Sequence, residues 1–281
     1  MTVSRADLDL TWSEGVERFL QSIRPDQVIL AAGRVGGIAV NRGQPAEFIY
    51  ENLMIQANLI HGAWKAGVSR LLNFGSSCMY PRDCPQPMHP VHLMGGPLEP
   101  TSEPYAIAKW AGMTMCSSYN RQYGTRFITA IPTTIYGPGD CFDPVQSHVV
   151  SGLIFRFHEA KEQGVDSITL WGSGTSRREF VYVEDAAEAC ELLLDRYEQD
   201  IPVNIGTGES IQIRQLASLI AQVVGFQGAI RWDPSQPDGA PEKRLDSTVL
   251  QGLGWSARTT LWTGLEQTYR WFLEHSLCVS L

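Results

Sequence analysis

A tyrosine and a lysine lie four residues apart in the segment Tyr105-Ala-Ile-Ala-Lys109. On a helix, this spacing places a phenol and an ammonium group on the same face, one turn apart. Because a nearby cation favours phenolate, we expect Lys109 to lower the pKa of Tyr105 from its ordinary value of about 10. Such a tyrosine suits general acid and base catalysis at a carbonyl or an alcohol. Surface pairs with this spacing are common, so the motif gains meaning only from the residues around it.

Small polar residues follow a predicted buried strand in the segment Phe74-Gly-Ser-Ser-Cys-Met-Tyr80. The carboxyl end of such a strand is the edge at which open α/β sheets bind ligands. Ser76 or Ser77 is therefore placed to donate a hydrogen bond to a substrate oxygen beside Tyr105. The alternative is a turn of small residues that caps the next element.

Apolar runs alternate with helical patterns in the first half of the chain. The predicted strands are 27–32, 70–74 and 127–131, and the predicted helices between them are 48–66 and 104–123. Gly67 and Gly124 stand where these two helices should end. The alternation predicts an α/β fold with a Rossmann-like, doubly wound parallel sheet.

The regular alternation of strand and helix patterns ends after Tyr136-Gly-Pro-Gly139. The predicted helices are about 147–163, 185–197, 213–224 and 261–275, with short strands at 168–171 and 179–182 and a Pro/Gly-rich loop at 233–241. We expect a cofactor-type domain over 1–142 and a smaller α+β substrate domain over 143–281, with about 178–205 returning to the first domain. The cleft between them is the expected site.

Composition narrows the classes of partner. The chain of 281 residues has 22 basic and 30 acidic residues, and its net charge of −8 would repel a nucleic acid. We predict a cytoplasmic protein without a membrane partner, because the chain shows no leader sequence and no apolar run of about 18 residues. Its six cysteines form no Cys-x-x-Cys pair, which disfavours a metal site or a disulfide scaffold and favours reduced thiols.

Seven motifs occur in order and together resemble the GDP-L-fucose synthase family of extended short-chain dehydrogenase/reductases. They are Gly75-Ser-Ser-Cys78, Tyr105-x-x-x-Lys109, Pro132-Thr-Thr-Ile-Tyr-Gly137, Ser147-His148, Trp171-Gly-Ser-Gly-Thr175, Arg178-Glu-Phe180 and Asn204-Ile-Gly-Thr-Gly208. The resemblance covers the chain from about Arg5 to Glu274. It implies 3,5-epimerisation of GDP-4-keto-6-deoxy-D-mannose followed by NADPH-dependent reduction at C4, which gives GDP-L-fucose.

The resemblance also assigns roles to residues. Cys78 and His148 match the family's epimerisation pair; Tyr105 gives the proton in the reduction, Lys109 holds the tyrosine and the nicotinamide ribose, and Ser76 orients the keto oxygen. The cofactor positions are Arg5, Ser76, Ser77, Lys109, Pro132, Thr133, Thr134, Ile135 and His148, and the turn 32–37 matches a second cofactor loop. The GDP-sugar positions are Arg156, Trp171, Arg178, Asp238 and Lys243. The resemblance further implies a homodimer that packs through the helices 48–66 and 104–123.

The largest departure from the family is a missing motif. The sequence has no Gly-x-x-Gly-x-x-Gly turn, whose backbone N–H groups would hold the cofactor pyrophosphate. The resemblance implies that this chain begins near the family's third strand, which should leave Val28-Ile-Leu30 as an unpaired apolar edge. Either the protein's true start lies upstream, or the chain is a truncated paralogue that binds a nucleotide sugar or a partner without turnover.

Smaller departures leave further alternatives open. Thr134 and Cys141 replace asparagines, Arg177 replaces a methionine, and Glu242 replaces a basic residue and brings a negative charge near the expected phosphates. Another extended sugar-nucleotide enzyme, a 4-epimerase or a 4,6-dehydratase, is the nearest rival. A dehydratase is disfavoured because Ser-Cys-Met follows Ser76 where an acidic pair would be expected.

Overall fold

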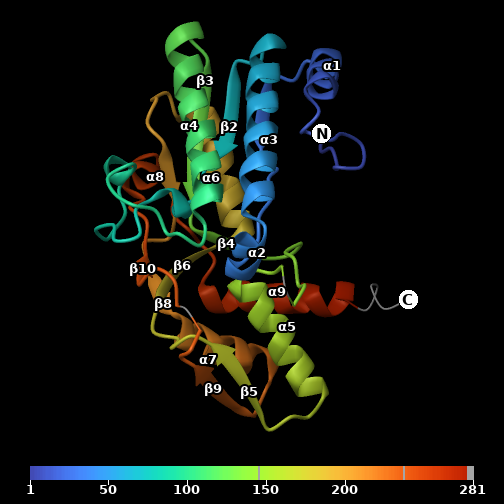
Figure 1. Ribbon diagram of the computed structural model, residues 1–281, viewed down its shortest axis with the longest axis vertical. Coiled ribbons are helices and arrows are strands. Elements are labelled where there is room, and N and C mark those ends of the chain that lie inside the picture. Colours follow the sequence, from blue (N-terminus) through green and yellow to red (C-terminus); the bar gives the residue numbers. More distant parts are fainter. Residues whose placement is uncertain (145, 237, 277–281) are drawn as a thin grey trace.

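A parallel sheet of four strands lies in the upper half of the molecule in Figure 1, with the order β1-β2-β3-β7. The strands are β1 (Gln27–Leu30), β2 (Arg70–Phe74), β3 (Arg126–Pro132) and β7 (Val203–Ile205). This computed structural model describes residues 1–144, 146–236 and 238–276. The three predicted strands are confirmed, although β1 ends two residues earlier than the sequence indicated.

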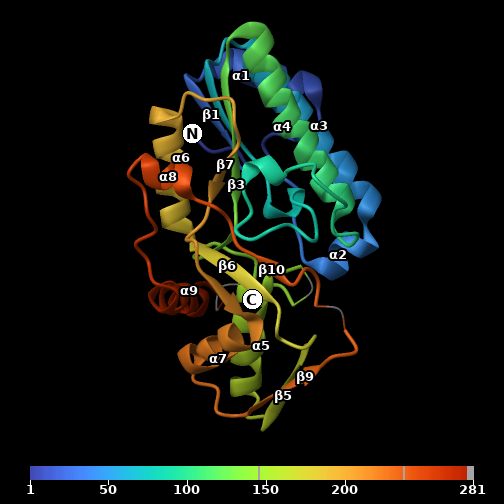
Figure 2. The same ribbon diagram turned by 90° about the vertical axis from the view of Figure 1, so that its left-hand side faces the viewer.

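Helices cover both faces of this sheet, as Figure 2 shows. Leu71 and Phe127 pack with α3 (Pro45–Lys65), whereas Leu72 and Ile128 pack with α6 (Val183–Arg196) on the opposite face. Successive strand residues point to opposite faces, which is why neighbours in one strand enter different cores. The doubly wound α/β fold is confirmed.

The two long helices that carry the candidate residues lie side by side. α4 (Glu103–Tyr123) packs along α3, and a Cβ on Gly112 would lie 2.0 Å from Gln56 Oε1, so only glycine fits there. Each helix has a proline in its first turn, and Gly124 ends α4 in the left-handed conformation with φ 68°. α4 therefore begins and ends as its start and stop signals predict, whereas α3 begins at Pro45, ahead of the predicted start at Phe48, and ends close to Gly67.

A helix that the sequence reasoning did not predict, α1 (Ser13–Ile23), packs on the outside of α3. Val16 and Leu20 are buried against the sheet-side core, and Gly62 of α3 leaves room for them. Val16, Phe19, Leu20 and Ile23 recur at helical spacing, so the sequence held an amphipathic signal for this helix that the sequence reasoning missed.

The expected apolar edge at β1 is present only in part. β1 pairs along its whole length with β2, from Gln27 opposite Arg70 to Leu30 opposite Asn73, and it is an outer strand of this sheet, so its predicted position at the edge is confirmed. Leu30 is buried in the core beside α3, whereas Ile29 is 47% exposed. Among the described residues, no strand pairs with the other side of β1. The apolar edge is therefore narrower than expected, because α1 and α3 cover one face of it.

Two further small sheets and the remaining helices complete the described chain. The strands are β4 (Thr134–Tyr136), β5 (Ser167–Trp171), β6 (Arg177–Tyr182), β8 (Ser210–Gln212), β9 (Ala229–Asp233) and β10 (Glu242–Lys243). The helices are α2 (Ile38–Gly43), α5 (Val149–Glu162), α7 (Ile213–Val224), α8 (Thr248–Gly252) and α9 (Leu261–Ser276), with 3-10 turns at Ser77–Met79 and Pro90–His92. β6 lies between β10 and β4, and β5 pairs with β9.

The lower half of the molecule has its own apolar core. It is built from α5, α7, α9 and the strands around them, with Phe157 and Ile220 near its centre. In Figure 1, β6 and β10 lie between this half and the upper sheet. No helix of the described residues is long and apolar enough to cross a membrane.

Candidate active site

The turn that follows β2 brings the small polar residues to the carboxyl edge of the sheet. Gly75 N–H donates to Ala130 O at 2.8 Å, and a Cβ at this position would lie only 2.9 Å from Met79 Sδ. Ser76 then caps the short turn, because its hydroxyl accepts from Cys78 N–H at 3.2 Å. The capping role is therefore correct for Ser76. The Ser76 hydroxyl also lies close enough to the Tyr105 phenol to act on its pKa, so the capping serine also lies in the candidate site.

Lys109 is buried where α4 crosses the end of β2. Its ammonium group donates to Phe74 O at 2.9 Å and lies 5.8 Å from the centre of the Tyr105 ring. Burial, which penalises the charged form, lowers the pKa of Lys109 to about 8. The lysine is thus positioned by the backbone of β2, and it loses its proton at a lower pH than an exposed lysine does.

The expected effect of Lys109 on Tyr105 is not found. Burial is the largest influence and raises the pKa of the Tyr105 phenol; the charge of Cys78 raises it further, and only the Ser76 hydrogen bond opposes them. The prediction of a lowered tyrosine pKa is therefore wrong for this structure. Sequence spacing gave the proximity of the two groups correctly, but it carried no information about how deeply both would be buried.

The loop after β1 connects Lys109 with the start of α5. A Cβ placed on Gly33 would lie 3.6 Å from Lys109 Nζ, and one on Gly37 would lie 3.3 Å from Ser147 O. His148, the next residue, is half-buried and caps α5 through its carbonyl group, which accepts from Gly152 N–H at 2.8 Å. Among the described residues, the His148 side chain makes no hydrogen bond with Cys78 or Tyr105.

The remaining expected cofactor residues lie in two places. Pro132, Thr133, Thr134 and Ile135 form the crossing from β3 to β4, where Thr133 N–H donates to Ile205 O and its hydroxyl donates to Glu179 O. Ser77 is half-buried in the turn beside Ser76.

Arg5 lies on the outer side and is exposed, and its guanidinium pairs with Glu51 at 3.4 Å. Arg34 pairs with the same carboxylate, and its N–H donates to Asn52 Oδ1. The sequence reasoning assigned no role to Glu51 or Asn52, because ordinary helix positions gave no signal.

These residues fit the nicotinamide half of a dinucleotide. Lys109, Ser76 and the crossing from β3 to β4 meet at one edge of the sheet, and the glycines of the loop 33–37 allow a close backbone approach there. The pyrophosphate half would need backbone N–H groups from a glycine-rich turn, and the sequence contains no such turn. The fit therefore holds for the reacting end of the cofactor.

The expected GDP-sugar residues gather around the loop after β5. Asp238 accepts from Ser173 N–H and from the Ser173 hydroxyl, each at 2.8 Å, and Arg178 donates to Asp238 O at 3.4 Å. Arg156 reaches across from α5 to donate to Thr169 O at 2.7 Å. Trp171 ends β5 with 63% of its surface exposed, which leaves its ring open to a ligand. Asp238 thus has a structural task, which the sequence did not indicate.

Two of the departures from the family pattern compensate each other. Glu242 lies 3.8 Å from the guanidinium of Arg177 and an equal distance from that of Arg244, and it accepts from the Ser210 hydroxyl at 2.7 Å. The negative charge of Glu242 is therefore partnered within the chain. Because neighbours on a strand point to opposite faces, its side chain lies on the face away from Lys243.

A buried carboxylate on β6 binds the backbone of two segments that are distant in the sequence. Glu179 on β6 accepts from Gly208 N–H at 2.6 Å and from Leu245 N–H at 2.7 Å, and it is fully buried. Burial raises its pKa, while the two backbone N–H groups and Thr207 act in the opposite direction. The sequence held a signal for this residue, since a carboxylate inside the otherwise apolar run 179–182 must find partners.

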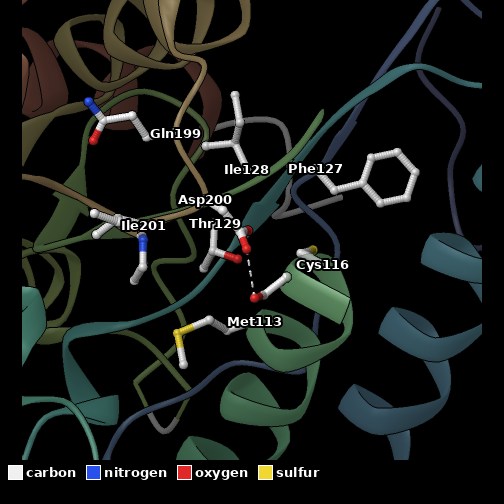
Figure 3. A pocket seen from close by; sticks show the side chains of 10 residues that line it. Met113, Cys116, Phe127, Ile128, Thr129, Gln199, Asp200 and Ile201 are labelled. Carbon is white, nitrogen blue, oxygen red and sulfur yellow. Dashed lines mark hydrogen bonds between the residues drawn. The ribbon is translucent and has the colours of Figure 1, made fainter. Parts of the chain in front are cut away.

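A small pocket lies elsewhere, towards the start of β3 (Figure 3). It has a volume of about 20 Å³ and is crossed by the hydrogen bond from Ser117 to Asp200 at 2.9 Å. Its lining residues are Met113, Cys116, Ser117, Phe127, Ile128, Thr129, Gln199, Asp200, Ile201 and Pro202. It holds about one water molecule and lies at the opposite end of β3 from the candidate site.

Comparison with known proteins agrees with this geometry. Residues 2–206 match the NAD dependent epimerase/dehydratase family. The chain belongs to this family. It is 49% identical to GDP-L-fucose synthase 1 of Arabidopsis thaliana over 272 residues, which cover 97% of this chain and 84% of the relative. It is 48% identical to the GDP-L-fucose synthase of Escherichia coli strain K12, covering 97% of this chain and 88% of the relative.

A solved structure also shows similarity to a GDP-L-fucose synthetase. A GDP-L-fucose synthetase from Naegleria fowleri, bound to NADP, superposes on this family member with a TM-score of 0.91 at 25% identity, covering 99% of this chain and 86% of that one. The resemblance to the GDP-L-fucose synthases, which the seven motifs predict, is confirmed.

The burial of Lys109 predicts a specific pH dependence of stability. Below pH 8 the lysine is charged in both the folded and the unfolded protein, whereas between pH 8 and 10.5 only the unfolded protein keeps the proton. Stability therefore rises with pH in this window, by about 3 kcal/mol in total. The Lys109→Met variant lacks this titration. We therefore expect the unfolding free energy of wild type minus that of Lys109→Met, measured by urea denaturation, to rise by that amount from pH 8 to 10.5. A difference that stays flat from pH 8 to 10.5 would contradict the buried, charge-penalised lysine.

Proposed function

We propose that this protein is an NADPH-dependent 3,5-epimerase and 4-reductase that converts GDP-4-keto-6-deoxy-D-mannose to GDP-L-fucose. The observation that carries the proposal is the meeting of Ser76, Cys78, Tyr105 and Lys109 at the carboxyl edge of the sheet. The GDP-L-fucose synthases that share nearly half of this sequence support the choice of substrate.

The epimerisation requires a base and an acid on opposite faces of the sugar. A 4-keto group acidifies the hydrogens on C3 and C5, so a base can remove each proton and an acid can return one to the other face. Cys78 on the turn after β2 and His148 at the start of α5 take these roles in our proposal. The lowered pKa of Cys78 supports its choice as the base.

The reduction at C4 uses the residues on α4. Bound NADPH supplies the hydride for this step. Tyr105 keeps its proton because burial raises its pKa, so it is a proton donor to the C4 oxygen as the negative charge develops there. Ser76 orients that oxygen by a hydrogen bond, and Lys109 binds the nicotinamide ribose while Phe74 O fixes its position.

The nucleotide part of the substrate requires cations and an apolar wall. We assign the diphosphate to Arg156 and Arg178, because the planar guanidinium fork matches phosphate oxygens. Trp171 supplies an exposed ring, and Asp238 keeps the loop 172–175 in place beside it. In this proposal residues 1–142 and about 178–205 serve the cofactor, and the rest of 143–281 serves the substrate.

A cytoplasmic location agrees with the state of the thiols. Cys78, Cys84, Cys116, Cys141 and Cys190 are free, and such thiols persist in a reducing compartment.

Replacement of the tyrosine tests the reductase role. We expect Tyr105→Phe to slow substrate-dependent NADPH oxidation by about 100-fold to 10,000-fold, because the proton donor is lost. The measurement is the fall in nicotinamide absorbance with the keto-sugar present. Tyr123→Phe, at the exposed end of the same helix, is the matched control and should keep the wild-type rate. An unchanged rate in Tyr105→Phe would remove this residue from the mechanism.

We further propose that the protein is a homodimer through α3 and α4. Large apolar side chains remain exposed on these helices, with Tyr50 61% and Ile107 40% exposed. We expect a mass of about twice 31.2 kDa by light scattering at micromolar concentration. Ile107→Asp should give monomers, whereas Trp262→Asp on α9 should not. A monomeric wild type would contradict the proposal.

A further inference from the structure

The cysteine that we assign as the base touches a lysine from a distant part of the chain. Cys78 lies in the turn after β2, and Lys243 ends β10, 165 residues later. The Lys243 ammonium nitrogen is 3.4 Å from Cys78 Sγ. β10 pairs in parallel with β6, with Lys243 opposite Arg178, and this register points the lysine at the turn.

Several groups surround the Cys78 sulfur. Lys243 approaches from β10, Arg178 from β6 and Tyr105 from α4, while the hydroxyls of Ser76 and Ser102 lie close enough to act on the pKa of the thiol. Burial is the largest single influence and raises the pKa of the thiol, but the charge of Lys243, the two hydroxyls and the Lys243 hydrogen bond together outweigh burial and leave the pKa below its usual value. Lys243 exerts the strongest of the favourable effects.

The contact changes the role expected for Lys243. The family resemblance places it among the ligands of the GDP-sugar, yet its ammonium group is already in contact with a sulfur atom in this structure. The neighbouring Glu242 does not compete for the lysine, because Arg177, Ser210 and Arg244 partner that carboxylate. Lys243 is thus free to act on Cys78.

We propose that Lys243 is a positioning residue that keeps Cys78 as a thiolate before the substrate binds. The proposal rests on the proposed function, in which Cys78 removes a proton from the sugar. In that step the C–H bond next to the keto group breaks, an S–H bond forms, and the electron pair moves onto the C4 oxygen as an enolate. Lys243 keeps its own proton throughout, and its charge stabilises the sulfur only before the transfer. A thiolate is the form of cysteine that can accept the proton.

The direct test is the pH dependence of Cys78 alkylation in the absence of substrate. Iodoacetamide reacts with the thiolate, and mass spectrometry of the Cys78 peptide gives the rate at each pH. We expect Lys243→Met to move the titration midpoint upwards and to slow alkylation at pH 7 by about tenfold or more, since one pKa unit changes the thiolate fraction tenfold. Lys243→Arg, which keeps the charge, should restore most of the rate.

Two controls separate a local effect from a loss of structure. The exposed Cys141 in the same samples should react at the same rate in every variant. Melting temperatures check folding, and Lys243→Gln replaces Lys243→Met if the methionine variant does not fold. An unchanged Cys78 midpoint in a folded, uncharged variant would overturn the proposal.

Turnover distinguishes the proposal from a phosphate-binding role. We expect Lys243→Met to slow uptake of solvent deuterium into the sugar while the KM for the GDP-sugar stays the same. A raised KM with an unchanged Cys78 midpoint would overturn the proposal in favour of a phosphate ligand. If Lys243→Met shifts the Cys78 midpoint but the wild-type protein shows no turnover, the result supports the lysine–cysteine pair and contradicts the proposed function. Failure of this proposal and failure of the proposed function therefore give different results.

Discussion

The buried carboxylate of Glu179 is the constraint on which the rest of the site depends. It accepts backbone N–H groups from the turn after β7 and from the segment after β10, while its own strand lies between β10 and β4. A carboxylate removed from water is costly unless its oxygens are satisfied, so these segments must come together for the charge to be tolerated. As a result, Lys243 and Arg178 are held beside residues that belong to the upper sheet.

Two separate parts of the fold position the reactive groups. The carboxyl ends of β2 and β3 and the helix α4 hold Ser76, Tyr105 and Lys109 at fixed places. β6 and β10 carry the cations Arg178 and Lys243, and Lys243 contacts Cys78. Cys78 therefore lies where the two halves meet, in contact with an ammonium group from β10 and near a phenol from α4. An acid for the reduction and a base for the epimerisation can then coexist in one site, because burial raises the pKa of Tyr105 while Lys243 lowers that of Cys78.

The sequence predicted the parts of this account that depend on local pattern. The strand 70–74 and the helix 213–224 lie where their apolar patterns place them, and Pro104 and Gly124 mark the limits of α4. The motifs also indicated the correct family. What local pattern could not supply is the set of contacts between distant segments. The pairing of Arg177 with Glu242 and the contact of Lys243 with Cys78 depend on the register between β6 and β10. The pKa of Tyr105 was mispredicted for the same reason, since burial is a property of the whole fold.

The central claim is that one site both epimerises and reduces a keto-sugar nucleotide. Its most direct test is to incubate the protein with GDP-4-keto-6-deoxy-D-mannose and NADPH in D₂O and to analyse the product by NMR and mass spectrometry. The account predicts GDP-L-fucose that carries solvent deuterium at C3 and C5 and hydrogen from the cofactor at C4. Binding of the GDP-sugar without NADPH oxidation, or reduction without deuterium at C3 and C5, would contradict it.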